Sequence, residues 1–317
     1  MMIRFGSGLS AALVFGICGA PVMADALVLQ PRATIGQQRY ELVFEDVLVP
    51  DDSGGFDFRD GFGIADTLLI KGAGLTATYG SFFVDVSGQW SDTGNSESIQ
   101  FMGRATGQGL APGNGHAHRE LNSFDRKEFN GTVGWAVTSN LSAYFGYKRA
   151  TVDLTQSTTP VLSPLPDFGD VLFVGDYAME FEYDGYFVGA TYSVPVRTWG
   201  AISLQSSVAR LDGTFSQVFT GAAVIFTGTL TPFFLDPSFR NGVVDGRSTG
   251  INVGISWTGN FGALGAGFDR LSYTIGVDHS EYTFDGGQSN AFWAADFTEK
   301  TTRGRFDLRY RFAVGGE

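Results

Sequence analysis

Hydrophobic and polar residues alternate with a period of two along most of the chain. This period is typical of β-strands with one apolar and one polar face. It is sharpest near the C-terminus, where Phe306, Leu308, Tyr310 and Phe312 alternate with charged residues. Clear segments occur at 82–91, 128–137, 141–148, 250–257, 271–278 and 305–312. Less regular strands are expected at 32–49, 65–79, 178–194 and 201–211, which makes ten.

Short and long connections alternate between these segments. Short turns are expected near 80–81, 138–140, 196–200 and 258–263. Long loops are expected at 50–64, 92–127, 152–177, 212–247 and 283–296. Membrane β-barrels have this alternation, with tight periplasmic turns and long outer loops. We therefore predict an all-β, antiparallel, up-and-down transmembrane barrel of about ten strands; in the alternative, Val218–Leu230 adds two strands to make twelve.

Closure of the sheet follows from backbone hydrogen bonding, because an open sheet edge in lipid would leave polar groups unpaired. A soluble secreted β-sandwich would show the same alternation. The asymmetry of loop lengths, the aromatic content and the C-terminal strand favour the barrel. Aromatic residues near predicted strand ends are expected to form interfacial girdles, namely Trp90, Trp135, Tyr147 and Trp257.

The composition narrows the classes of function. The chain has 317 residues with 44 Gly and 29 Phe, and only 17% are charged, against about 25% in soluble domains. A net charge of −12 argues against nucleic acid as a partner. His116 and His118 lack the further ligands that a metal site needs. We expect no metal, no cofactor and no transmembrane helix, because no long apolar run follows the N-terminus.

Residues 1–24 have the features of an export signal. A basic start precedes the apolar stretch Phe5–Gly19, and a small-x-small motif ends at Ala24. We expect cleavage after Ala24, which removes the only cysteine, Cys18, and leaves 25–317 as a single barrel domain. The expected location is the cell outer membrane.

The final strand carries a resemblance to a known superfamily. Its alternating Phe306, Leu308, Tyr310 and Phe312 are similar to the C-terminal signal that the barrel-assembly machinery reads. With the pattern of the whole chain, this strand resembles the Gram-negative outer-membrane β-barrel superfamily, without the motif of one subfamily. The resemblance implies outer-membrane lipid, lipopolysaccharide and the barrel-assembly machinery as partners. The chain departs from the usual signal because Ala313–Glu317 follow the last aromatic residue.

Enzymes of this superfamily can be tested by residue spacing. Omptin proteases carry Asp-x-Asp and Asp-x-His pairs, whereas no two Asp residues here are two apart and Asp278 adjoins His279. Adjacent side chains on a strand point to opposite faces. The His-x-Ser of outer-membrane phospholipases and lipid A deacylases is also missing. His279 and Glu281 are expected on the lipid side and Ser280 on the other, so we expect no catalytic residues.

Charges on two strands predict a network inside the barrel. On the last strand, one face carries Arg303, Arg305, Arg309, Arg311 and Asp307. Near 178–188, one face carries Glu180, Glu182 and Asp184, and the other carries Met179, Phe181 and Tyr183. Arginine facing lipid costs about 2–4 kcal/mol at the midplane. We therefore expect both charged faces to point inward and pair across the lumen, joined by Glu41 of the first strand.

Two of the expected outer loops, 161–174 and 218–234, are strongly apolar. Exposed apolar patches indicate a contact. These loops either pack together or extend the hairpins, bind an unknown partner or ligand, or add membrane strands. Because side chains can fill a small barrel, we expect a non-enzymatic structural or surface-binding barrel with a largely filled lumen. The alternatives are a narrow porin-like channel for small solutes and an outer-membrane hydrolase with an unrecognised site.

Overall fold

The computed structural model describes most of the chain beyond the N-terminal segment. The described residues are 27–44, 46–50, 56–60, 63–106, 109–162, 171–197, 199–225, 233–235, 242–262, 265, 268–286 and 296–314. The export signal expected at 1–24 and Cys18 lie outside them. No helix in this described part is long and apolar enough to cross a membrane.

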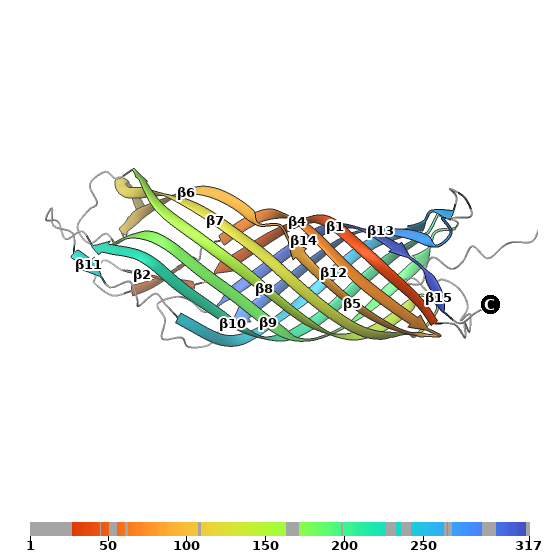
Figure 1. The fold of residues 1–317 in the computed structure, drawn as a ribbon. Coiled ribbons are helices and arrows are strands. Elements are labelled where there is room, and N and C mark those ends of the chain that lie inside the picture. Colours follow the sequence, from red (N-terminus) through yellow and green to blue (C-terminus); the bar gives the residue numbers. More distant parts are fainter. Residues whose placement is uncertain are drawn as a thin grey trace, which may run out of the picture.

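Ten strands of the described residues form a closed barrel, and they are strongly tilted relative to its axis (Figure 1). They are β1 (Leu27–Phe44), β4 (Gly63–Tyr79), β5 (Phe82–Ser91), β7 (Gly109–Ala136), β8 (Leu141–Leu162), β9 (Val171–Pro195), β10 (Ala201–Ile225), β12 (Gly242–Asn260), β13 (Leu271–Asp285) and β14 (Phe297–Tyr310). Each pairs antiparallel with the next, and β1 pairs with β14 to close the ring. The predicted ten-strand barrel is confirmed, since β10 runs unbroken where the twelve-strand alternative needs a turn.

The remaining strands mark the two ends of the barrel. At one end lie β6 (Gly94–Thr106) on β7, β11 (Phe233–Leu235) on β10, and the hairpin of β2 (Asp46–Pro50) and β3 (Phe56–Asp60). At the other end, β15 (Phe312–Val314) pairs with the start of β1. Figure 1 shows β2, β6 and β11 far from β15 and the C-terminus. We call the end with the short connections the turn end, and the other the hairpin end.

The strands are longer than the sequence pattern indicated. The predicted loop at 92–127 is largely β-structure, because β7 already begins at Gly109. Most of the predicted loops at 152–177 and 212–247 also continue as strands, since β8 runs to Leu162 and β10 to Ile225. The expectation of long loops in these places was wrong. In 152–155 and 211–215 the alternation persists, but its polarity is inverted, because Val152, Leu154, Leu211 and Phe215 are buried and the residues between them are polar or Gly213.

The part of the barrel near the turn end has an apolar outer surface. Exposed apolar side chains here include Ile35, Leu75, Phe82, Val84, Val86, Phe129, Val133, Phe145, Val188, Leu204, Ile255 and Ile275. In β9 this part spans 186–194, and a tilted strand of that length rises roughly 20 Å. That height is close to the apolar band of about 25 Å on membrane barrels. We call this part the belt section.

Beyond the belt section the outer surface is polar and the interior is apolar. In β9 this distal section spans 176–184, where the outward residues are polar except Ala178 and the inward ones are aromatic or Met179. Among the described residues, sixteen buried hydrophobic side chains form one core inside the barrel. The rings of Phe181, Phe284 and Phe297 are at its centre, with centroids 4.7–5.1 Å apart. This core fills the barrel at the height where the outer surface is polar.

The two apolar segments predicted as outer loops lie beside one another. Their backbones pair in the β9–β10 ladder, which continues as far as Val171 opposite Ile225. The ring of Phe219 is buried and lies 4.5 Å from that of Tyr177. The described parts of the two segments, 171–174 and 218–225, thus extend a hairpin, as the first of the three interpretations held, and within them no further membrane strands are added.

Candidate functional site in the lumen

Ionised side chains fill the lumen below the aromatic core in two connected groups. The distal cluster contains Arg126, Glu128, Lys148, Asp278, Glu299 and Arg303. The proximal cluster, nearer the turn end, contains Arg32, Asp85, Arg305, Asp307 and Arg309. Strand alternation brings these side chains inward while their neighbours face out, so charge is kept from lipid.

Arg126 connects the distal cluster to the aromatic core. It pairs with Glu128, its Nε donates to Glu299 at 3.2 Å, and its terminal nitrogen donates to the Tyr183 hydroxyl at 2.7 Å. The Tyr183 hydroxyl in turn donates to Glu299 at 3.1 Å. Burial raises the pKa of Tyr183 well above its usual value. The neutral phenol is thereby kept as a hydrogen-bond donor at the base of the aromatic core.

Glu128 is the centre of the distal cluster. Its carboxylate accepts a hydrogen bond from Arg126, lies 3.2 Å from Lys148 Nζ, and lies 3.3 Å from a terminal nitrogen of Arg303. Arg303 also donates through Nε to Asp278 at 2.8 Å. Three basic groups thus face three carboxylates. This balance of charge offsets the free-energy cost of removing each charged group from water.

The proximal cluster is built on two aspartates. Arg32 holds Asp85 with two hydrogen bonds, of 2.5 and 2.9 Å, and Thr76 donates to the same carboxylate at 2.6 Å. Asp307 accepts from Thr34 at 2.6 Å and from Arg309 at 3.2 Å. These contacts tie β1, β4, β5 and β14 together across the inside of the wall.

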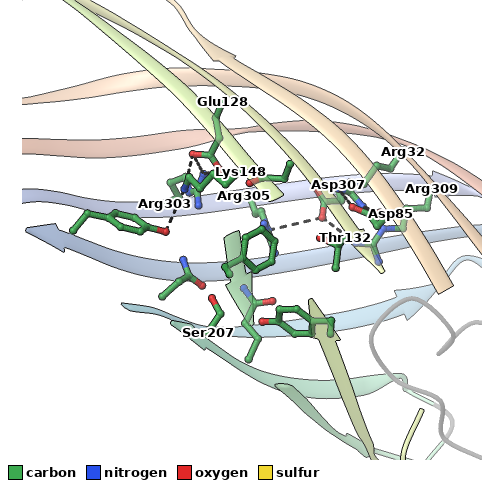
Figure 2. A pocket seen from close by; sticks show the side chains of 16 residues that line it. Arg32, Asp85, Glu128, Thr132, Lys148, Ser207, Arg303, Arg305, Asp307 and Arg309 are labelled. Carbon is green, nitrogen blue, oxygen red and sulfur yellow. Dashed lines mark hydrogen bonds and ion pairs between the residues drawn. The ribbon is translucent and has the colours of Figure 1, made fainter. Parts of the chain in front are cut away.

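A cavity of about 140 Å³ lies between the charged wall and the opposite side of the barrel. Figure 2 shows Glu128, Lys148 and Arg303 at one end of the charged wall and Arg32, Asp85 and Arg309 at the other. Arg305 and Asp307 lie between them. The facing wall is neutral and carries Tyr144, Phe187, Gln205, Ser207 and Asn252.

The structure brings together only part of the predicted lumen network. Arg303, Arg305, Asp307 and Arg309 line the lumen. Arg311 lies after the end of β14, where it is half-buried and its backbone N–H donates to the carbonyl of Arg270 at 2.9 Å.

The prediction of the acidic partners of these arginines was wrong. Glu180, Glu182 and Asp184 lie on the outer face of β9, where Glu182 pairs with Arg149 and Asp184 accepts from Tyr147. Glu41 also faces outward and pairs with Arg39 at 2.6 Å. The physical reason is that these residues lie in or near the distal section, where the interior of the barrel is an apolar core. Polar residues therefore face out, and the residues between them, such as Phe181, face in.

The actual carboxylate partners were partly visible in the sequence. Asp85, Glu128 and Asp278 lie on the polar face of strands that the alternation predicted. Arg126 and Glu299 lay outside those segments, so only the longer strands of the structure place them inside. No local motif marks them.

Other predicted residues occupy the outer face. Trp90 and Trp135 are exposed there, and Tyr147 and Trp257 are half-buried. At the end of the chain, Phe306, Leu308 and Phe312 are exposed, and Tyr310 is half-buried. Their roles as girdle and assembly signal stay predictions.

The possible catalytic group at 279–281 is split across the wall. His279 contacts Thr302 at 2.9 Å on the outer face, whereas Ser280 is buried inside. Among the described residues, no group of three or more His, Cys, Asp and Glu could hold a metal ion.

Comparisons with solved structures show the fold. The outer-membrane protease OmpT of Escherichia coli superimposes with a TM-score of 0.51 at 9% identity, over 91% of this chain and 97% of that one. Ail of Yersinia pestis, solved in complex with sucrose octasulfate, gives 0.30 at 7% identity over 89% and 99%. A FadL homologue of Pseudomonas aeruginosa gives 0.28 at 8% identity over 90% of both chains. No protein-family model and no curated protein matches the sequence. The chain has the fold of outer-membrane β-barrels.

Proposed function

We propose that this outer-membrane β-barrel is a filled, non-enzymatic barrel that presents its long hairpins at the cell surface. The segment 1–24 would direct export and be removed, and the terminal strand ending at Phe312 would engage the barrel-assembly machinery. Outer-membrane lipid and lipopolysaccharide would surround the belt section. The hairpin end would then face the exterior, because long connections of such barrels lie outside.

The observation that supports a filled barrel is its closure at two levels. In the distal section, Leu211, Phe284 and Phe297 are each 0% exposed. Just below, Glu299 is also fully buried and held by Arg126 and Tyr183. Solute passage would need both an apolar core and an ion-paired layer to open. Neither is a lining suited to a steady stream of hydrated solutes.

The outer surface of the distal section supports a role at the cell surface. Its exposed side chains form cross-strand ion pairs, such as Arg149 with Glu182 and Lys127 with Asp153. A water-facing polar surface over an apolar core is the arrangement of a soluble domain. The distal section therefore extends the barrel beyond the membrane and holds the hairpins away from it.

Conductance across a planar bilayer tests this proposal. The purified barrel, inserted at single-molecule level, is expected to give no steady openings. The double variant Arg126→Ala with Phe297→Ala, which removes one side chain from each level, is expected to give openings that the wild type lacks. Lys127→Ala with Phe145→Ala is the matched control, because both side chains face outward. Steady openings of the wild type would instead support the narrow channel for small solutes.

A further inference from the structure

The two ion clusters of the lumen differ in their balance of charge. The distal cluster has three basic and three acidic side chains. The proximal cluster has three arginines but only two aspartates. One positive charge in the proximal cluster is therefore without a carboxylate of its own.

The geometry identifies that charge as Arg305. Its closest carboxylate oxygens belong to Asp278, at 3.6 Å, and to Asp307, at 3.9 Å. Each of these aspartates already has a closer arginine: Arg303 lies 2.8 Å from Asp278, and Arg309 lies 3.2 Å from Asp307. Contacts of 3.6 and 3.9 Å are longer than hydrogen bonds. A guanidinium taken out of water without such bonds is costly, so a compensating group is expected.

Arg305 is the more accessible of the two arginines that flank Asp307. Arg305 keeps 20% of its side chain exposed, compared with 4% for Arg309. The Nε atoms of both arginines lack an acceptor among the described residues. Both residues line the cavity (Figure 2). Those two Nε atoms are themselves covered, but Arg305 as a whole stays partly exposed and has no carboxylate within hydrogen-bond distance. Such a guanidinium is able to receive an anion.

The facing wall completes the receptor with neutral groups. Gln205, Ser207 and Asn252 supply amides and a hydroxyl but no further carboxylate. A Cβ built at Gly254 would lie 2.8 Å from the Gln205 amide nitrogen and 3.1 Å from the Cβ of Asp278. The Gln205 side chain and Asp278 therefore both approach Gly254 on the lumen side of β12.

We propose that the lumen cavity binds one small oxyanion, held by Arg305 against the neutral wall. Its volume of about 140 Å³ equals that of about four to five water molecules, which is room for an anion of phosphate size. The planar guanidinium fork suits the oxygens of phosphate or carboxylate better than it suits a halide. Binding neutralises the surplus charge of the proximal cluster and joins β14 to the neutral wall formed by β10 and β12.

The test measures thermal unfolding of the folded barrel in detergent micelles against inorganic phosphate at constant ionic strength. The unfolding temperature is expected to rise saturably with phosphate, by about 3 °C at a concentration tenfold above the dissociation constant. Arg305→Gln is expected to abolish the rise. Lys71→Gln is the control: it removes the same charge from an exposed outward pair with Asp92. This variant should still show the rise in unfolding temperature with phosphate.

A second variant serves if Arg305→Gln does not fold. Gln205→Glu supplies a carboxylate inside the cavity while Arg305 stays in place. It should raise the unfolding temperature without phosphate and remove the response to phosphate. The proposal is overturned if the wild type shows no saturable response, if chloride produces an equal response, or if either lumen variant responds like the wild type.

Discussion

The belt section and the distal section are made of the same strands, yet their polarity is opposite. In β9, Tyr186 and Val188 face outward at 59% and 54% exposure in the belt section. A few residues earlier on the same strand, Phe181 and Tyr183 face inward at 3% and 1%. Between the two sections, the aromatic side chains change from the outer face to the inner face.

The comparison shows that the surroundings decide what a period-two pattern means. In lipid, apolar groups are tolerated outside and charges gather in the lumen. In water, the same strand gains from burying apolar groups inside and exposing charges. The change lies near Tyr183 and Arg126, where the hydrogen bonds of Tyr183 with Arg126 and Glu299 join the aromatic core to the distal cluster.

The largest effect is expected from Arg126→Met, which removes the basic partner of buried Glu299. Breaking a buried ion pair on one side costs about 3–5 kcal/mol. Lys127→Met is the matched control, since the neighbouring residue faces outward and its ion pairs are 3.5 and 3.6 Å long. That exposed change should cost about 0–1 kcal/mol. Urea unfolding in micelles measures both, and equal losses would contradict the assignment of inside and outside.

Phe297→Ala tests the apolar core of the distal section. The side chain is 0% exposed and lies between Phe181 and Phe284, so a cavity should cost about 3 kcal/mol. Phe145→Ala, at 47% exposure in the belt section, should cost less because lipid or detergent fills the space. Free energies of unfolding for both variants decide the comparison. A larger loss for Phe145→Ala would show that the distal section is not packed as a core.

Val188→Arg tests the lipid contact of the belt section. An outward arginine near the midplane costs about 2–4 kcal/mol in a bilayer. Ala178→Arg lies ten residues earlier, is also exposed on β9, and belongs to the distal section. That change should stay within about 0.5 kcal/mol. Folding equilibria in lipid vesicles measure the difference, and equal costs would refute the boundary drawn between the sections.

The smallest effect is expected from Tyr183→Phe, which tests the contact at the boundary between the belt section and the distal section. Loss of the hydroxyl contacts with Arg126 and Glu299 should cost about 1–2 kcal/mol at neutral pH. Burial raises the pKa of Tyr183, so the folded state favours the protonated phenol. This contribution is complete below the ordinary tyrosine pKa of about 10, and it declines as the pH rises from there toward the folded-state pKa. The gap between wild type and variant should therefore narrow in alkaline buffer, whereas a constant gap would show that the phenol is not buried.

The sequence predicted the fold more fully than the lumen. Alternation around Val84, Val133 and Ile255 sufficed to find ten strands, because lipid contact imposes a regular pattern. Asp85 and Glu128 belong to the polar face of that pattern, although the sequence did not single them out as partners of the arginines. It failed for Glu180 and its neighbours, because alternation shows that two faces differ but does not show which one points inward.

The sequence by itself determined a closed barrel, its strand number and the inward direction of Arg303, Arg305 and Arg309, since an apolar outer face and full backbone pairing are required in lipid. Only the tertiary structure decided where the strands leave the membrane. It also decided which carboxylates meet those arginines, because Glu128 and Arg303 are 175 positions apart in the chain. Pairing across a lumen depends on strand tilt and register, and both are properties of the closed sheet.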